Sequence, residues 1–257
     1  ARNNDLQSKL EFLDVYIDMT LDDKWKQLAT ALVLESSLDE KSVKNIIQRL
    51  VNSGEYNFTY SLLSKYREHT GKTDFYSIEL GTYLGMRMSY ESSTREYLLY
   101  LKNHPQQIEV ISDRIMVFPD DPNINASVKT VLIESPLNAA KFILADLQFK
   151  LEEFDQAYKT LINNDASLNM LLDFGKELAS VKEYVRAEKV LAQIIRSTDN
   201  DKILTQTIFE IAKIFEAQMV LSHSELPISG FYPYNSFFST PYAHIKETSG
   251  TTLQQAM

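Results

Sequence analysis

The sequence predicts an all-α protein in which short helical hairpins follow one another along the chain. One pattern is written twice, thirty residues apart: LADLQFKLEEFDQAYKTL begins at Leu144, and FGKELASVKEYVRAEKVL begins at Phe174. Self-similarity at a period of roughly 20–50 residues is typical of stacked-repeat proteins. All seven prolines lie at Pro105 or later, so the residues before it can be nearly continuous helix.

The two copies place small residues where two helices must approach closely and an aromatic residue where the second helix should begin. The aromatic residues are Phe154 and Tyr184. The small residues are Ala145 and Gly175 in the first helix, and Ala157 and Ala187 in the second.

This pattern resembles the tetratricopeptide repeat, a helix–turn–helix unit of about 34 residues with large–small pairs in its first helix. The resemblance implies a right-handed α–α superhelix of about six helical hairpins over residues 1–221, followed by an irregular extension over residues 222–257. The corresponding first-helix positions recur at spacings of 34, 34, 30, 30 and 37 residues: Ile47, Gly81, Ile115, Ala145, Gly175 and Ala212.

Capping signals predict four helices before the first glycine-terminated stop. Thr20 with Asp23, and Ser37 with Glu40, have the spacing of a capping box. Gly71 is expected to end the fourth helix. The helices are expected over residues 6–19, 20–35, 37–51 and 56–69.

Further signals divide the rest of the chain into hairpins. Leu80–Gly81 is the large–small pair of the next unit, which Pro105 ends. The FPDDPN segment at 118–123 predicts a turn inside the most divergent unit, and Ser135–Pro136 predicts the start of a helix. The last helix is expected over residues 203–221.

Composition narrows the function and the compartment. A net charge of −9 argues against general nucleic-acid binding, which requires a basic surface. No apolar run approaches the length of a transmembrane helix. The lack of cysteine excludes disulfides, thiolate metal sites and a cysteine nucleophile. Location in the cytoplasm fits this composition, and so does a periplasmic or other extracytoplasmic location if Ala1 follows a cleaved signal peptide.

The sequence contains no pattern typical of catalysis or of a cofactor site. Its four histidines, His69, His104, His223 and His244, lack metal-ligand spacing. No Ser-His-Asp arrangement can be assembled from motif context. We therefore expect no metal, no cofactor and no enzymatic activity, and an enzyme on a helical scaffold is the least favoured hypothesis.

In the family that the chain resembles, first helices line a concave groove that holds an extended peptide. The resemblance implies that Lys150, Lys176 and Lys213 converge in this groove, where such lysines grip a terminal carboxylate; the alternative is that they are ordinary solvated lysines. The candidate groove residues are Asn52, Thr82, Met86, Asp146, Lys150, Lys176 and Lys213.

Two functions remain open after these observations. The first is a non-catalytic scaffold or adaptor whose partner is another protein or a peptide. The second is a structural subunit of a larger complex, such as one of the cell envelope, with its flanks and tail buried in the assembly. The oligomeric state is left open.

The C-terminal extension has an unusual composition. Residues 226–245 contain three prolines, six aromatic residues and no Lys, Arg, Asp or Glu. Because exposing such a segment to water is costly, we expect it to lie against apolar surface, either on its own chain or on a partner. The aromatic residues are Phe231, Tyr232, Tyr234, Phe237, Phe238 and Tyr242.

Overall fold

The computed structural model describes residues 2–19, 22–34 and 38–222 of the chain. It is 81% helix, and no strand occurs among the described residues, which confirms the predicted all-α class. The helices are α1 (Arg2–Asp18), α2 (Asp22–Val33), α3 (Glu40–Asn52), α4 (Tyr56–Thr70), α5 (Ser77–Met86), α6 (Tyr90–Asn103), the 3-10 helix η1 (Pro105–Gln107), α7 (Ile108–Met116), α8 (Pro122–Glu134), α9 (Asn138–Lys150), α10 (Phe154–Asn163), α11 (Leu168–Ser180), α12 (Tyr184–Ser197) and α13 (Asp201–Ser222).

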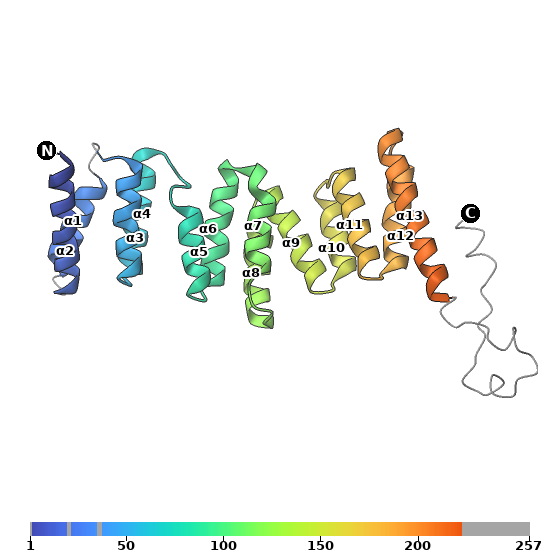
Figure 1. Cartoon of the computed structure of the whole chain (residues 1–257), viewed down its shortest axis with the longest axis horizontal. Helices are drawn as coiled ribbons and strands as arrows, with labels where there is room; N and C mark the ends of the chain where they lie inside the picture. Colours follow the sequence, from blue (N-terminus) through green and yellow to red (C-terminus); the bar gives the residue numbers. More distant parts are fainter. Residues whose placement is uncertain (1, 20–21, 35–37, 223–257) are drawn as a thin grey trace, which may run out of the picture. The chain divides into compact units, whose positions relative to one another are not determined.

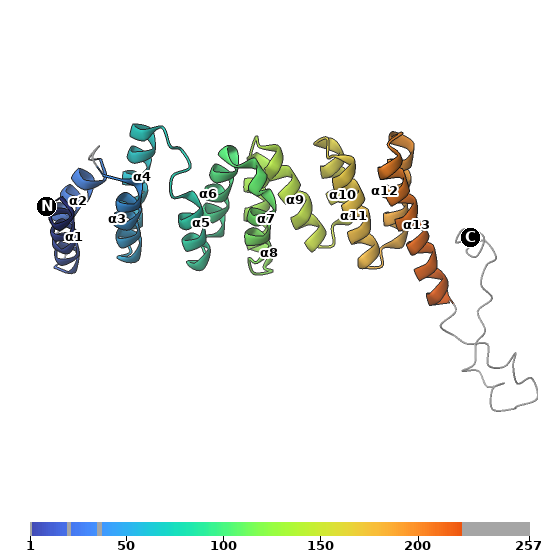
Figure 2. The ribbon, with the colours of Figure 1, turned by 45° about the horizontal axis from the view of Figure 1, so that its top comes forward.

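The chain divides into two compact units, residues 1–157 and 158–257. In the first unit, Figures 1 and 2 show α3 beside α4 and α5 beside α6. Helix α6 also packs against α7 and α8, and α9 packs against α7 and α8. In the second unit, α11, α12 and α13 all pack against one another.

The first unit has two apolar clusters. One joins α1 to α5 and is built around Trp25, whose ring meets Phe58 edge-on with ring centroids 4.9 Å apart. The other joins α6 to α9 around the fully buried Ile111 and Leu132. Between them, Arg67 of α4 forms a buried ion pair with Glu96 of α6 and also donates to the Ser77 hydroxyl.

Four hairpins share one register. Counted from Ile47, Gly81, Ala145 or Gly175 in the first helix, the seventh residue along the chain has a left-handed backbone conformation. These residues are Gly54, Met88, Glu152 and Lys182. Two residues later the second helix begins with an aromatic residue, which confirms the role predicted for Phe154 and Tyr184. These aromatic residues are Tyr56, Tyr90, Phe154 and Tyr184. We call the first position of the register the close-approach position; it is held by Ile47, Gly81, Ala145 and Gly175.

The second helix packs closely against both close-approach glycines. A Cβ atom at Gly81 would lie 2.7 Å from the Tyr97 ring of α6, and one at Gly175 would lie 2.7 Å from the Leu191 side chain of α12. The small residues predicted on the second helix, Ala157 and Ala187, are fully buried. The close-approach role predicted for Gly175 is therefore confirmed.

Helix ends confirm some predicted signals and correct others. Gly71 ends α4 in the left-handed conformation, as predicted. The cap of α3 is Asp39, which accepts a hydrogen bond from the Ser42 amide; the predicted cap Ser37 lies outside the described residues, as does Thr20. Ser135 follows α8 rather than opening α9, because the extended residues 135–137 separate the two helices.

The predicted turn at 118–123 is present and leads into α8. Asp121 caps α8 by accepting hydrogen bonds from the amides of Asn123 and Ile124, and Pro122 is the first helical residue. The predicted extension at 222–257 lies outside the described residues apart from Ser222, which ends α13.

Candidate functional site

The predicted groove residues lie on odd-numbered helices, as the resemblance implies. Asn52 is on α3, Thr82 and Met86 are on α5, and Asp146 and Lys150 are on α9, all in the first unit. Lys176 on α11 and Lys213 on α13 belong to the second unit. The convergence of these three lysines therefore stays a prediction.

Polar contacts join successive odd-numbered helices of the first unit at about one repeat of sequence separation. The Tyr76 hydroxyl at the start of α5 donates to Gln48 of α3 at 2.5 Å. Arg114 of α7 donates to the Thr82 hydroxyl of α5 at 2.5 Å. We call this set the odd-helix ladder; it consists of Gln48, Tyr76, Thr82, Ser112, Arg114, Asp146 and Lys150.

The ladder continues from α7 to α9 through Asp146 and Lys150. The Ser112 hydroxyl donates to the Asp146 carboxylate at 2.6 Å. Desolvation raises the pKa of Asp146, and the nearby Asp113 adds to this, although the Ser112 hydrogen bond opposes it. Asp146 as a whole residue is exposed, so the desolvation arises from the atoms packed around its carboxyl group. Lys150 donates to the carbonyls of Met116 and Phe118 at 2.8 and 3.2 Å, which caps the C-terminal end of α7.

Of the other predicted groove residues, three have polar partners on their own helix and the fourth is a largely exposed methionine. Asn52 accepts a hydrogen bond from Gln48 of the same helix, at 2.9 Å. Met86 is 75% exposed. In the second unit, Lys176 pairs with Asp173 at 2.9 Å, and Lys213 pairs with Glu210 at 3.0 Å.

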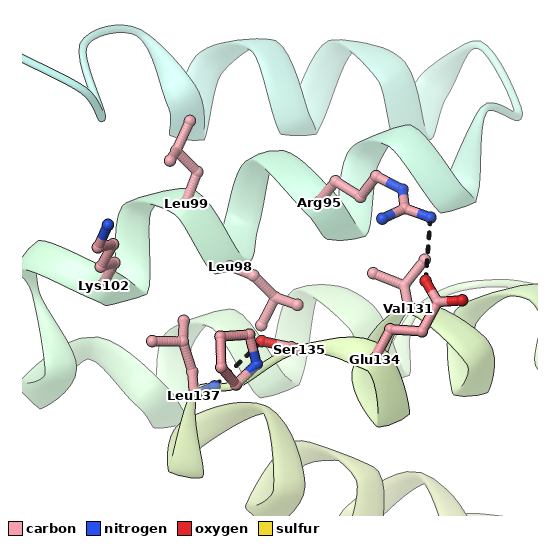
Figure 3. Close-up of a pocket in the computed structure, with 9 residues that line it drawn as sticks. Arg95, Leu98, Leu99, Lys102, Val131, Glu134, Ser135 and Leu137 are labelled. Atoms are coloured by element: carbon pink, nitrogen blue, oxygen red, sulfur yellow. Dashed lines mark hydrogen bonds and ion pairs between the residues drawn. The ribbon is translucent and has the colours of Figure 1, made fainter.

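An apolar hollow with a volume of about 370 Å³ lies between α6 and α8 (Figure 3). In Figure 3, Leu98 of α6 points toward Val131 of α8 and toward the turn that follows α8. Leu137 and Pro136 close the pocket from that turn. We call this hollow the α6–α8 pocket; it is lined by Arg95, Leu98, Leu99, Lys102, Val131, Glu134, Ser135, Pro136 and Leu137.

Charges stand at the two ends of the α6–α8 pocket. Arg95 at one end pairs with Glu134 at 3.5 Å and with Glu91 at 3.0 Å. Lys102 stands at the opposite end, and it makes no ion pair with any described residue. The pocket therefore combines an apolar floor with one cation that is free to meet a carboxylate.

A second hollow of about 480 Å³ is polar, and charged side chains that line it form ion pairs with one another. Lys44 pairs with Glu79, Lys72 pairs with Glu40, and His104 contacts Asp74 at 2.8 Å. Burial raises the pKa of Asp74, but hydrogen bonds from Asn103 and His104 outweigh it and hold that pKa below its ordinary value. These pairs join α3 to α5 and to the connection between α4 and α5, and they join that connection to the residue after α6.

Sequence reasoning missed the α6–α8 pocket. Leu98, Lys102 and Val131 fall on even-numbered helices, which the resemblance does not single out for binding. The available signal was Ser135–Pro136, because residues 135–137 are extended and leave a gap in the helical surface.

Among residues 2–19, 22–34 and 38–222, no group of three or more His, Asp or Glu side chains is placed to hold a metal ion. Of the histidines, His69 and His104 are described, and His223 and His244 lie outside that part of the chain. No helix in the described ranges is long and apolar enough to cross a membrane. A comparison of the chain with protein-family models matches none of them, and a comparison with curated proteins finds no match.

Proposed function

We propose that this chain is a non-catalytic scaffold that binds a segment of another protein, and that one bulky apolar side chain of that segment enters the α6–α8 pocket. The observation that carries the proposal is the open apolar floor of Leu98, Val131 and Leu137. Its volume of about 370 Å³ is at the lower end of the roughly 300–1,000 Å³ of ligand pockets, which suits a side chain better than a large cofactor.

The charges at the pocket define the ligand further. Lys102 stands at one end without an ion-pair partner among the described residues, whereas Arg95 at the other end is already paired with Glu91 and Glu134. An acidic residue beside the apolar anchor would therefore meet Lys102. The preferred ligand is a segment that carries Leu, Met or Phe next to Asp or Glu.

The resemblance to tetratricopeptide repeats supports the same class of function. In this proposal the hairpins stack as a right-handed superhelix, and the odd-helix ladder holds successive first helices in fixed register. Arg114 donates to the Thr82 hydroxyl and lies 5.9 Å from the centre of the Tyr97 ring, and its side chain is still partly exposed. The odd-numbered helices then supply a second, weaker contact for the bound segment.

A structural subunit is the second candidate, and one observation favours it. Exposed apolar side chains gather at the turns that follow α5 and α7, where Met86, Met88 and Val117 are all largely exposed. Such an edge is typical of a surface that a permanent partner covers. A subunit of this kind would copurify with its partner in fixed stoichiometry, whereas a scaffold would exchange it.

The test is selection of binders from a displayed library of random peptides, followed by measurement of the dissociation constant by fluorescence anisotropy. Leu99→Lys should place a charge in the pocket and weaken the selected peptides by about tenfold or more, which corresponds to roughly 1.4 kcal/mol. Lys102→Glu should weaken peptides that contain an acidic residue and spare neutral ones.

Two control variants make the result specific. Leu99→Met keeps the apolar volume and should bind as the wild-type chain does, and Lys189→Glu changes an exposed charge in the second unit. If Leu99→Lys binds the selected peptides with unchanged affinity, the pocket is not the anchor. If Thr82→Val alone abolishes binding, the odd-numbered helices carry the site instead.

A further inference from the structure

We propose that residues 226–245 of this chain fold back on an apolar stripe of α13 and take the place of the second helix of its hairpin. The stripe consists of Ile208, Ala212 and Phe215, which lie on one face of α13 at helical spacing. The proposal is independent of the ligand proposed for the α6–α8 pocket.

The register of the hairpins identifies this stripe. In α11, the close-approach position is Gly175, and it is flanked by Leu171 four residues before and Leu178 three residues after. The second helix α12 packs on α11, with Leu191 directly over Gly175. Leu171 and Leu178 are 5% and 1% exposed.

The same positions of α13 are uncovered. Ala212 lies 37 residues after Gly175, and at that spacing Ile208 and Phe215 correspond to Leu171 and Leu178. Ile208 is 56% exposed, Ala212 is exposed and Phe215 is half-buried. A neighbouring face of α13 is buried at Thr207 and Ile214, and α13 packs on α11 and α12. In the described part of the chain, α13 is therefore a first helix without its second.

The segment that follows has the composition required to cover the stripe. Between Glu225 and Lys246 there is no formally charged side chain, and six aromatic residues lie between 231 and 242. Pro227, Pro233 and Pro241 interrupt any regular helix in the segment. An extended segment with its aromatic side chains packed on α13 would fit both the uncharged aromatic composition and the three prolines.

The connection is long enough. The stripe from Ile208 to Phe215 spans about 10 Å at roughly 1.5 Å per helical residue. Residues 223–230 reach about 26 Å at roughly 3.3 Å per extended residue, which is sufficient to turn back from the end of α13 at Ser222. Because the segment starts where α13 ends, its local concentration at the stripe is high, and it outcompetes a dilute partner.

Limited proteolysis of the full chain tests the proposal. Chymotrypsin cleaves after exposed aromatic residues, so docking should protect the peptide bonds after residues 231–242. Ile208→Asp places a charge in the stripe at an exposed position, and we expect it to raise the initial cleavage rate in this segment by about tenfold. Mass spectrometry assigns the cut sites.

The control is Gln206→Asp, which adds the same charge to an exposed position on another face of α13. It should leave the cleavage rate of residues 231–242 unchanged. Wild-type and Ile208→Asp chains that are cut equally fast would overturn the proposal. Protection that disappears on dilution would also overturn it, since it would show that the segment docks on a second copy.

Discussion

The hairpins α5–α6 and α11–α12 have the same register but different contacts between their helices. In α5–α6, the Ser93 hydroxyl donates to the Gly81 carbonyl at 2.6 Å, and the Tyr97 hydroxyl donates to Thr82 at 3.3 Å. In α11–α12, an aliphatic side chain, Leu191, covers Gly175. The register thus fixes how closely two helices approach, and the side chains decide whether polar or apolar contacts join them.

In the hairpin α5–α6, the second helix is also joined to the preceding hairpin by a buried ion pair. Helix α6 receives Arg67 from α4, and the guanidinium bonds both oxygens of Glu96, at 3.2 and 2.7 Å. Its remaining hydrogen bonds go to the Ser77 hydroxyl and the Phe75 carbonyl. Helix α6 therefore depends on buried polar partners that must all be present together.

The largest expected effect comes from breaking this ion pair. Glu96→Ala should destabilise the chain by about 3–5 kcal/mol, because it leaves the buried Arg67 charge without its partner. Urea unfolding monitored by circular dichroism measures the loss. The double variant Arg67→Met with Glu96→Leu should recover most of this loss. Failure to recover it would show that the ion pair stabilises the chain more than an apolar pair at the same two positions.

The next effect separates the two close-approach glycines. Gly81→Ala should cost about 1–3 kcal/mol, because its Cβ atom would meet the Tyr97 ring at 2.7 and 2.8 Å and the Ser93 carbonyl at 3.3 Å. Gly175→Ala should cost less than about 1 kcal/mol, since the Leu191 side chain can rotate and alanine favours helix over glycine. Equal losses in thermal or urea unfolding would contradict the distinction between a fixed ring and a side chain that can rotate away.

A gain in stability is expected at the turn. Lys182 has a φ of 67° in the turn between α11 and α12, where a side chain is strained. Lys182→Gly should stabilise the chain by about 0.5–1 kcal/mol. The left-handed conformation costs a non-glycine residue roughly 1–2 kcal/mol, and part of this gain is offset because glycine loses more conformational entropy on folding. Lys189→Gly, in the interior of α12, is the contrasting control and should destabilise.

The smallest effect is expected at Lys150. Lys150→Ala removes the hydrogen bonds to the Met116 and Phe118 carbonyls and should cost about 0.3–1 kcal/mol, the range of a cation near a helix C-terminus. The loss should diminish in high salt. The unchanged stability of Lys150→Gln at low salt would show that the carbonyl contacts need no positive charge.

The register was predictable because its residues are special in sequence as well as in space. Glycine and alanine at 81, 145 and 175, and aromatic residues nine positions later, have few substitutes in a tight helical hairpin. The α6–α8 pocket was not predictable, because it depends on α6 packing against α8 across the intervening α7. The role of Lys150 was missed for a similar reason, since its partners are carbonyls of another hairpin. The convergence of the groove lysines remains a prediction.

The left-handed turn residues make one edge of each hairpin chemically adjustable. Met88, Glu152 and Lys182 occupy the same backbone position, and all three are exposed. Hydrogen bonds from the following amides, such as that of Ser89 to the Leu84 carbonyl at 2.9 Å, close the turn without using these side chains. A thioether, a carboxylate and an ammonium group are thus equally compatible with one turn. The surface of this edge can therefore diverge from hairpin to hairpin while the helices beneath it keep their geometry.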